Sequence, residues 1–394
     1  MRVCCLAALL AVGLWPMDAQ VPSQWRLVEE WRVGGAVDGP HSFTNVRSLV
    51  VQPDGRLVVL ESKDQQVHFL SARGEPMRTV GRKGAGPGEF RNANGLVVTP
   101  SDQILVNDSE NARLTVLSAA GKVVQTIPHI GWGAVNQWDA RFNVQGHLAE
   151  NGVIVIAIDP TKGPIALNAR RTWNADFTHA DTVKAPECGN IPTAKTEDVA
   201  YRLPSPSGRG YQSLQYPFVM SGRSQITAPD GTHWIGLAPQ YRTIVAVAFE
   251  SCKPTATIVL RGPEIPVPGD VRAEIGAMLG RSASRGSALM GPDPGKVRRA
   301  LSYFEALAVD ASNRVWVERL VPGSVKFTAT GASGERRFDV YSAQGTLVAE
   351  VKVPAGLRTP RSGRPFVITD EHVYAFATDA DDAPYLVALR IIRD

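Results

Sequence analysis

The sequence lacks any strong bias of charge. Its 394 residues hold 42 Lys and Arg against 38 Asp and Glu, a formal net charge of +4, and no stretch contains five consecutive basic residues. Proteins that bind nucleic acid usually concentrate basic residues in one segment or on one face. The composition therefore gives no support to nucleic-acid binding.

Long hydrophobic runs are also missing, except at the N-terminus. No segment beyond residue 20 reaches the roughly 18 apolar residues of a membrane helix, so we expect no stable membrane insertion. Residues 3–15, after Arg2, carry no charge, and the sequence PMDA at residues 16–19 breaks the run. This pattern is typical of a secretory signal. It predicts a signal peptide at residues 1–19, cleaved after Ala19, and an exported protein, either periplasmic or extracellular.

Cysteine is scarce. The chain has four cysteines, and two of them lie in the predicted signal, which leaves Cys188 and Cys252 in the mature protein. Two cysteines in an exported protein most simply form one disulfide. The bridge would close a loop of 64 residues, which stabilises the fold by about 3–5 kcal/mol in the chain-entropy model. The alternative is two free thiols.

Several catalytic signatures are absent as well. The sequence has no Gly-x-Ser-x-Gly motif, which marks the nucleophile of many hydrolases. The glycine-rich residues 84–88 are not followed by Lys and Ser or Thr, so they do not form a nucleotide-binding loop. The seven histidines lack the close spacing of a zinc motif. The sequence therefore leaves any catalytic residues unknown.

Turn-forming residues, by contrast, are abundant, with 36 Gly and 28 Pro. Residues 48–62 read SLVVQPDGRLVVLES and residues 95–109 read GLVVTPSDQILVNDS, and each is a strand, a tight turn and a strand. Both continue with a third strand (66–70 and 113–117) and a fourth (77–80 and 122–127). Four antiparallel strands repeated at about 47 residues predict the blades of an all-β propeller.

Four further units follow, with first strands near residues 142, 224, 306 and 366. The last unit lacks a fourth strand, and the strand predicted at residues 25–33 is left over. Placing this strand in blade six closes the ring and removes an open sheet edge. The sequence thus predicts one six-bladed β-propeller over residues 20–394, and two separate all-β domains are the alternative.

One insertion does not fit the strand pattern. Between blades four and five, residues 268–304 have apolar residues at helical spacing, at positions 271, 275, 278 and 279. We predict a helix at residues 270–279 and a second short helix at residues 294–304, joined by a Gly- and Ser-containing link.

The segment KGAGPGEF at residues 83–90, followed by GLVV at 95–98 and VNDSENARL at 106–114, resembles the NHL-repeat family of six-bladed propellers. In that family a glycine-rich loop between blades ends in Glu-Phe, and an Asp, an Asn and an Arg follow. The resemblance implies that Asp108, Asn111 and Arg113 tie neighbouring strands together. It implies a fold and no chemistry.

Propellers bind ligands at one end of the central channel, where the loops between blades and the loops between second and third strands lie. Arginine and aromatic residues are frequent in these loops, which favours a cleft for an anionic or sugar-like ligand, or for a partner protein. The alternative is that these arginines are ordinary exposed residues and that the aromatic residues seal blade interfaces. The candidate ligand-binding residues are Arg82, Arg91, Trp132, Arg141, Tyr241 and Arg242.

An enzyme is the competing hypothesis. Some secreted propellers, the lactonases and the peptide-amidating lyase, hold a metal in the channel, and such ligands need not be close in sequence. The residues that could be assigned to a calcium site are Asn45, Glu61, Asn94, Asn107 and Asp108. We predict a monomeric binding protein with no cofactor and no metal site. A metal-dependent hydrolase or lyase, with Ca or Zn, remains the alternative.

Overall fold

The computed structural model describes residues 22–35, 43–129, 139–142, 146–159, 163–184, 200–204, 211–215, 225–236, 242–247, 253–283, 297–328, 331–359, 365–379 and 383–393. The predicted signal peptide, Cys188, Cys252, Trp132 and Tyr241 lie outside these residues. The predicted cleavage and the predicted disulfide therefore stay predictions.

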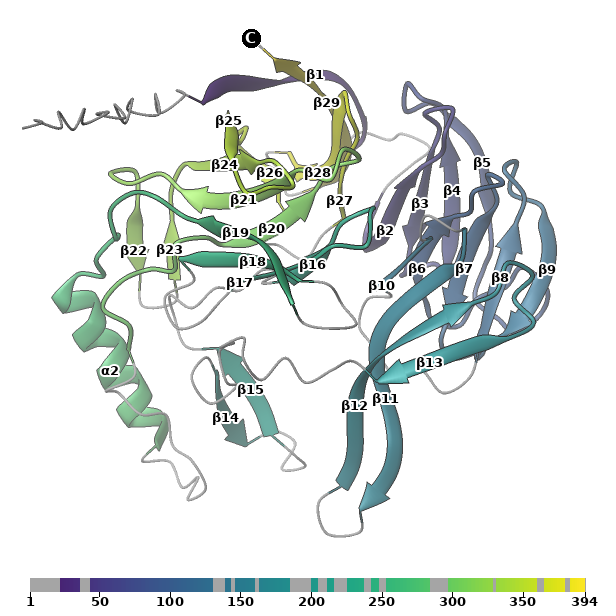
Figure 1. Cartoon of the computed structure of the whole chain (residues 1–394), viewed down its shortest axis with the longest axis horizontal. Helices are drawn as coiled ribbons and strands as arrows, with labels where there is room; N and C mark the ends of the chain where they lie inside the picture. The colour runs from purple at the N-terminus through teal and green to yellow at the C-terminus, as the bar shows by residue number, and fades with distance from the viewer. Residues whose placement is uncertain are drawn as a thin grey trace, which may run out of the picture.

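Two sheets near the N-terminus have the four-stranded antiparallel form that the repeat predicts (Figure 1). Their second strands, LVVLE and ILVND, are buried along their whole length. Leu57 and Val59 pack on one side of the first sheet, whereas Val58 and Leu60 pack on the other. Burial on both faces explains why these strands read as continuous apolar runs. Sheet one consists of β2 (Val46–Val51), β3 (Leu57–Glu61), β4 (Gln66–Leu70) and β5 (Pro76–Val80), and sheet two of β6 (Ala93–Val98), β7 (Ile104–Asp108), β8 (Arg113–Leu117) and β9 (Val123–Pro128).

Two further four-stranded sheets follow. Sheet three differs in length, because its two central strands stay paired as far as Asp159 and Gly163, well past the ends of their neighbours. In Figure 1 this ribbon extends away from the rest of the molecule. Sheet three consists of β10 (Asp139–Phe142), β11 (Leu148–Asp159), β12 (Gly163–Trp173) and β13 (Ala180–Lys184), and sheet four of β16 (Gln225–Thr227), β17 (His233–Gly236), β18 (Thr243–Val247) and β19 (Pro254–Val259).

The C-terminal strands and the first strand of the chain form one nine-stranded sheet. β1 (Ser23–Gly34) runs antiparallel to β29 (Pro384–Arg393), from the pair Trp25 and Arg393 to the pair Gly34 and Tyr385. On its other edge β1 pairs in parallel with β25 (Leu347–Lys352) over residues 23–25. β1 thereby joins two units into one sheet. The other members are β20 (Ala306–Val309), β21 (Val315–Leu320), β24 (Arg336–Tyr341), β26 (Leu357–Arg358), β27 (Phe366–Ile368) and β28 (His372–Thr378).

An aromatic cluster holds this join together. Trp25 is 8% exposed, and its ring centroid lies 6.1 Å from that of Trp316, which is fully buried. The guanidinium groups of Arg314 and Arg393 lie over the Trp25 ring, 5.1 and 5.0 Å from its centroid. Burying two indole rings stabilises the sheet by several kcal/mol, at about 25 cal/mol per Å² of apolar area.

The first strands of the sheets lie next to one another around the middle of the molecule. Contacts run from β16 through β20, β27, β2 and β6 to β10. The sheets radiate from this arc (Figure 1), and clusters of apolar side chains fill the spaces between them. The structure thus confirms an all-β protein of propeller type, built mostly from four-stranded sheets.

A helix interrupts the strand order between β19 and β20. α2 (Gly269–Ala283) buries Ile275 against Val267, Val297 and Leu301. The second predicted helix is wrong for the described residues 297–304, which contain no helical turn. Instead, Val267 and Leu301 donate backbone hydrogen bonds to Arg299 and Ile265, because an extended segment can bond to residues 265–267 while it covers α2.

Two small hairpins were not anticipated from the sequence. They are β14 (Ala200–Pro204) with β15 (Tyr211–Gln215), and β22 (Lys326–Thr328) with β23 (Gly331–Ser333). Within the described part of the chain, no helix is both long enough and apolar enough to cross a membrane.

Candidate functional site

The loops of sheets one and two that could hold a ligand gather at one end. The loop at residues 62–65 contacts the start of the inner strand, since Ser62 donates a backbone hydrogen bond to Asn45. Gln65 in the same loop accepts a hydrogen bond from the backbone of Ala93, at the start of β6. Residues 81–92 connect the two sheets at this end. We call this end, with residues 43–45, 62–65, 81–92 and 109–112, the loop-rich end.

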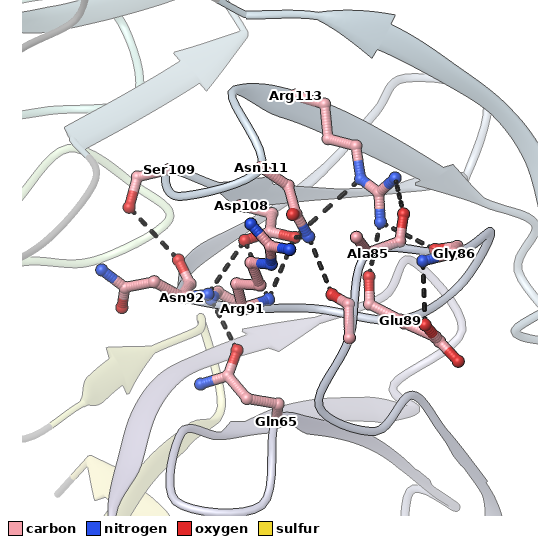
Figure 2. A network of polar contacts seen from close by, with 12 residues as sticks. Gln65, Ala85, Gly86, Glu89, Arg91, Asn92, Asp108, Ser109, Asn111 and Arg113 are labelled. Atoms are coloured by element: carbon pink, nitrogen blue, oxygen red, sulfur yellow. Dashed lines mark hydrogen bonds and ion pairs between the residues drawn. The ribbon is translucent and has the colours of Figure 1, made fainter.

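A buried carboxylate organises the loop between the two sheets (Figure 2). Asp108, at the end of β7, has no exposed surface. It accepts hydrogen bonds from the backbone N–H groups of Arg91 (3.2 Å) and Asn92 (2.9 Å) and from Asn111 Nδ2 (2.6 Å). Because a buried charge is tolerated only when its acceptor sites are used, these donors fix where the loop meets β6.

The rest of the loop is held through its carbonyl oxygens (Figure 2). Arg113 donates to the backbone oxygens of Ala85 (2.9 Å), Gly86 (2.8 Å) and Glu89 (2.6 Å), and Asn111 donates to that of Gly84 (3.0 Å). Each guanidinium or amide hydrogen thus replaces a water that the loop would otherwise bind. The Asp, Asn and Arg of the motif therefore serve to position this loop.

The loop also needs a glycine at its first position. Gly81 has a φ of +98°, and a Cβ atom there would lie 2.6 Å from Phe90 Cε2 and 2.7 Å from the Gln65 carbonyl oxygen. Phe90 is fully buried between sheets one and two. Only glycine allows the chain to pass this close to the phenyl ring.

In sheet one, Glu61 accepts hydrogen bonds from loop N–H groups as Asp108 does in sheet two. It is 1% exposed and accepts hydrogen bonds from the backbone of Thr44, Asn45 and Lys63, at 2.9, 2.9 and 3.0 Å. Both carboxylates of the hypothetical calcium site are therefore engaged by backbone donors. Within the described residues, no group of three or more His, Cys, Asp or Glu has the geometry of a metal site.

Two of the predicted ligand residues lie on the loop between sheets one and two. Arg82 is largely exposed and forms an ion pair with Glu89 at 2.7 Å. A hydrogen bond from the Gly86 backbone, and then the Arg82 side chain, lower the pKa of Glu89 below its usual range. Arg91 is exposed, and its described hydrogen bonds are those of its backbone N–H to Asp108. Arg82 and Arg91 thus share one rigid loop.

Of the other predicted residues, the structure describes Arg141, in sheet three, and Arg242, which directly precedes β18 of sheet four. Arg242 is exposed and donates from Nε to the Leu260 carbonyl oxygen at 3.3 Å, while its guanidinium lies 4.9 Å from the centre of the Tyr303 ring. Arg141 belongs to β10 and pairs with Ala149, and its side chain lies outside the described part of the structure. A shared site for all six candidates therefore stays a prediction.

Buried carboxylates occur in the remaining sheets with different partners. Glu150, on β11, lies 2.7 Å from His129 Nε2 and accepts a hydrogen bond from Trp173 Nε1 at 2.7 Å. Glu318, on β21, accepts a hydrogen bond from the hydroxyl of Thr359 at 2.5 Å. Both carboxylates are completely buried. Here side chains 21, 23 and 41 residues away in sequence contribute contacts to the carboxylates.

The sequence did not reveal the two β-bulges in the inner strands at the loop-rich end. The register of β2 against β3 shifts between Val46 and Ser48, and that of β6 against β7 shifts between Ala93 and Gly95. Arg47 and Asn94 are the extra residues. A bulge re-aims the side chain of its extra residue and is frequent beside functional sites. A register shift leaves no composition signal, which is why the sequence did not reveal Arg47.

Arg47 shares a feature with Arg272, another partly buried arginine of the described residues. In both, the Nε atom is buried and has no hydrogen-bond acceptor in the described structure. Asn94 and Asn107 are 2% and 3% exposed, and Asn107 Nδ2 donates to Asn94 Oδ1 at 2.8 Å. The remaining oxygen, Asn107 Oδ1, is buried without a donor. Buried polar atoms without partners are rare, so each one points to strain, a missing water or ion, or a ligand.

No family model matches the chain, and no curated protein matches it. Solved structures with a similar fold include a Bacteroides fragilis protein described as exported (12% identity, TM-score 0.48, covering 95% of this chain and 97% of that one). Virginiamycin B lyase from Staphylococcus aureus (11%, 0.44, 94% and 100%) and a gluconolactonase from Xanthomonas campestris (10%, 0.40, 88% and 87%) are also similar. At such identities and TM-scores the likeness gives neither a ligand nor a reaction.

Proposed function

We propose that the chain is an exported, monomeric, six-bladed propeller of NHL-like type that binds a small anionic ligand at its loop-rich end. Sheets one to four supply four blades, and the two units joined by β1 supply the fifth and sixth. The N-terminal run of residues 3–15 supports export. The contacts from β16 round to β10 place six first strands side by side in one arc, as a six-bladed ring requires.

The observation that carries the proposal is the Nε atom of Arg47, which is buried without a hydrogen-bond acceptor among the described residues. A buried donor on a cation costs free energy unless something satisfies it, and the usual partner is a carboxylate or another anion. Arg47 lies on β2, one residue from the loop-rich end of the strand. Glu61, Asp108 and Arg113 hold the surrounding loops in place, so a ligand would bind to a preorganised surface.

Calorimetric titration of the mature protein with cyclohexanecarboxylate at neutral pH and low salt tests the proposal. We expect saturable binding in the wild type and at least a tenfold loss of affinity in Arg47→Met, because a hydrogen bond to a charged group contributes about 1.5–3 kcal/mol. Arg73→Met is the matched control, since Arg73 is an exposed arginine in the turn between β4 and β5 at the opposite end of sheet one. Equal binding by the wild type and Arg47→Met would refute the proposal.

A further inference from the structure

Arginine side chains gather where sheet four packs against the nine-stranded sheet. Tyr303 and Tyr341 belong to the apolar cluster between these two sheets. Arg242 donates from Nε to the Leu260 carbonyl oxygen at 3.3 Å, and its guanidinium lies 4.9 Å from the centre of the Tyr303 ring. Arg319 donates from Nε to the Tyr303 carbonyl oxygen at 3.0 Å. One tyrosine therefore holds two guanidinium groups, the first at its ring and the second at its backbone.

Two more arginines lie near the second tyrosine. Burial, and then the charge of Asp339, raise the pKa of the Tyr341 hydroxyl to about 12. The charges of Arg319, Arg337 and Arg261 act against this rise. Charges influence a pKa in this way only over short distances, so these guanidinium groups lie close to the tyrosine. We use the name arginine cluster for Arg242, Arg261, Arg319 and Arg337.

Too few carboxylates contact the arginine cluster to neutralise it. Asp339 Oδ2 lies 2.7 Å from Arg319 Nη1, and Asp339 Oδ1 lies 2.8 Å from Arg337 Nε. Glu350 Oε1 lies 3.2 Å from Arg337 Nη1. The other two members of the cluster form no ion pair within the part of the chain that the structure describes. Four guanidinium groups and two carboxylates thus leave two positive charges without a counter-ion.

Acidic residues nearby in sequence do not remove this excess. Glu264 is exposed, and Glu305 is buried two residues after Tyr303. Among the described residues, neither forms an ion pair with a member of the arginine cluster. If the charge of Glu305 is counted as well, the cluster still has a net positive charge. Like charges held close together repel unless a counter-ion lies between them, so the cluster favours the binding of an anion.

The hydrogen-bond donors that the cluster leaves unused indicate which anion fits. The side chain of Arg242 donates only from Nε, and that of Arg319 donates from Nε and Nη1. Arg261 is exposed, and its side chain forms no hydrogen bond in the described structure. Gly262, at a φ of +112°, leaves room beside Arg319 Nη2, since a Cβ atom there would lie 3.3 Å from this nitrogen. Three guanidinium groups therefore have donors available to a ligand.

We propose that the arginine cluster binds a tetrahedral oxyanion of the phosphate type, either the free ion or the phosphoryl group of a larger molecule. A carboxylate has two oxygens in one plane and suits a single guanidinium edge, whereas a phosphate has oxygens on several sides and can accept from several guanidinium groups. The two positive charges without a counter-ion match a phosphate dianion. The cluster belongs to other sheets than Arg47, so this inference does not depend on the proposed function.

Calorimetric titration of the full mature chain at low salt with inorganic phosphate, methyl phosphate and acetate tests the inference. Both the wild type and Arg47→Met are titrated, so that carboxylate binding at Arg47 is separated from binding at the cluster. We expect Arg47→Met to bind inorganic phosphate as the wild type does, and at least about fivefold more tightly than acetate.

Variants of the cluster provide the decisive comparison. Arg242→Gln and Arg261→Gln should each weaken phosphate binding by at least about fivefold, because each removes a charged donor. Arg78→Gln is the matched control and should bind as the wild type does, since Arg78 is exposed on β5 of sheet one. A thermal melt of each variant monitors folding. If Arg242→Gln does not fold, Arg261→Gln decides, because no described bond of the Arg261 side chain is lost.

The outcomes separate this inference from the proposed function. No phosphate binding by the wild type would overturn the inference alone, since the proposed function is tested with cyclohexanecarboxylate. Phosphate binding that is lost in Arg47→Met and kept in both cluster variants would overturn the cluster as a site. Equal affinities of Arg47→Met for acetate and phosphate would overturn the tetrahedral oxyanion. A preference for methyl phosphate would support a phosphorylated ligand at the site, and a preference for inorganic phosphate would support the free ion.

Discussion

Sheets one and two hold their loop-rich end differently from sheet three and the nine-stranded sheet. In the first pair, Glu61 and Asp108 accept hydrogen bonds from backbone N–H groups of loops within about twenty residues in sequence. In the second pair, Glu150 and Glu318 bond to side chains, and the partner of Glu318, Thr359, is 41 residues away. All four sheets have a buried carboxylate, but only in sheets one and two does its bonding to the N–H groups of a nearby loop form a repeated motif.

This difference determines how well the hydrogen-bond partners of each carboxylate tolerate its substitution. Backbone N–H groups can only donate, so the backbone partners of Glu61 and Asp108 are fixed, and Asp108 has the Asn111 amide as a further donor. His129, beside Glu150, has a ring nitrogen that can donate or accept. A side-chain partner of this kind can therefore adapt to an altered carboxylate, whereas a backbone N–H group cannot.

The largest effect is expected for Asp108→Asn. The amide would direct N–H hydrogens at the backbone donors of Arg91 or Asn92, or at Asn111, and at least one of these would lose its acceptor. We expect the free energy of unfolding, measured by urea denaturation, to fall by about 3–4 kcal/mol. Asp64→Asn, at an exposed position of the loop at residues 62–65, is the control. Equal losses for the two variants would show that the hydrogen bonds of Asp108 are not the cause of the loss.

A second, smaller effect concerns Tyr341 of the nine-stranded sheet. Burial, and then the charge of Asp339, raise the pKa of the Tyr341 hydroxyl to about 12. Since the unfolded chain releases this proton near pH 10, stability should be lost as the pH rises from about 10 to 12, by about 2 kcal/mol. Unfolding at several alkaline pH values should show a weaker pH dependence in Tyr341→Phe. If wild type and variant had the same slope, the hydroxyl would not be responsible.

The smallest effect is expected for Glu150→Gln. The glutamine oxygen can still accept from Trp173, and its amide can donate to His129 once the imidazole changes tautomer. Arg171, whose Nε lies 4.0 Å from the carboxylate, loses a countercharge. The expected loss in the free energy of unfolding is about 1.5 kcal/mol, below that of Asp108→Asn in the same urea titration. A loss as large as that of Asp108→Asn would show that both regions are equally unable to adapt.

The same distinction explains what could be predicted from the sequence. The strands of sheets one and two follow from their alternating turns and apolar runs, and the third strand of sheet two was predicted with its observed bounds, Arg113–Leu117. The parallel pairing of β1 with β25 could not be foreseen, because it joins residues 326 positions apart. The second helix of the insertion failed because residues 297–304 form backbone bonds to a distant segment rather than to one another.

The candidate site was only partly accessible to sequence reasoning. Asp108, Asn111 and Arg113 form a local motif, so their contribution to the loop could be inferred from the resemblance. Asn94 and Asn107 were considered as metal ligands, but their mutual hydrogen bond was not anticipated. Arg47 was not considered, because its importance depends on the register of β2 against β3 and on the lack of an acceptor for Nε.

The pairing of β1 with β29 has a consequence for the order of folding. Glu30 of β1 bonds to His372, which lies 342 residues later, and the strand that β1 covers ends at Arg393. β1 must therefore wait, without its antiparallel partner, until β29 has been made. Contacts of such long separation slow folding and leave intermediates with open edges. The native topology therefore becomes attainable only once β29 has been made.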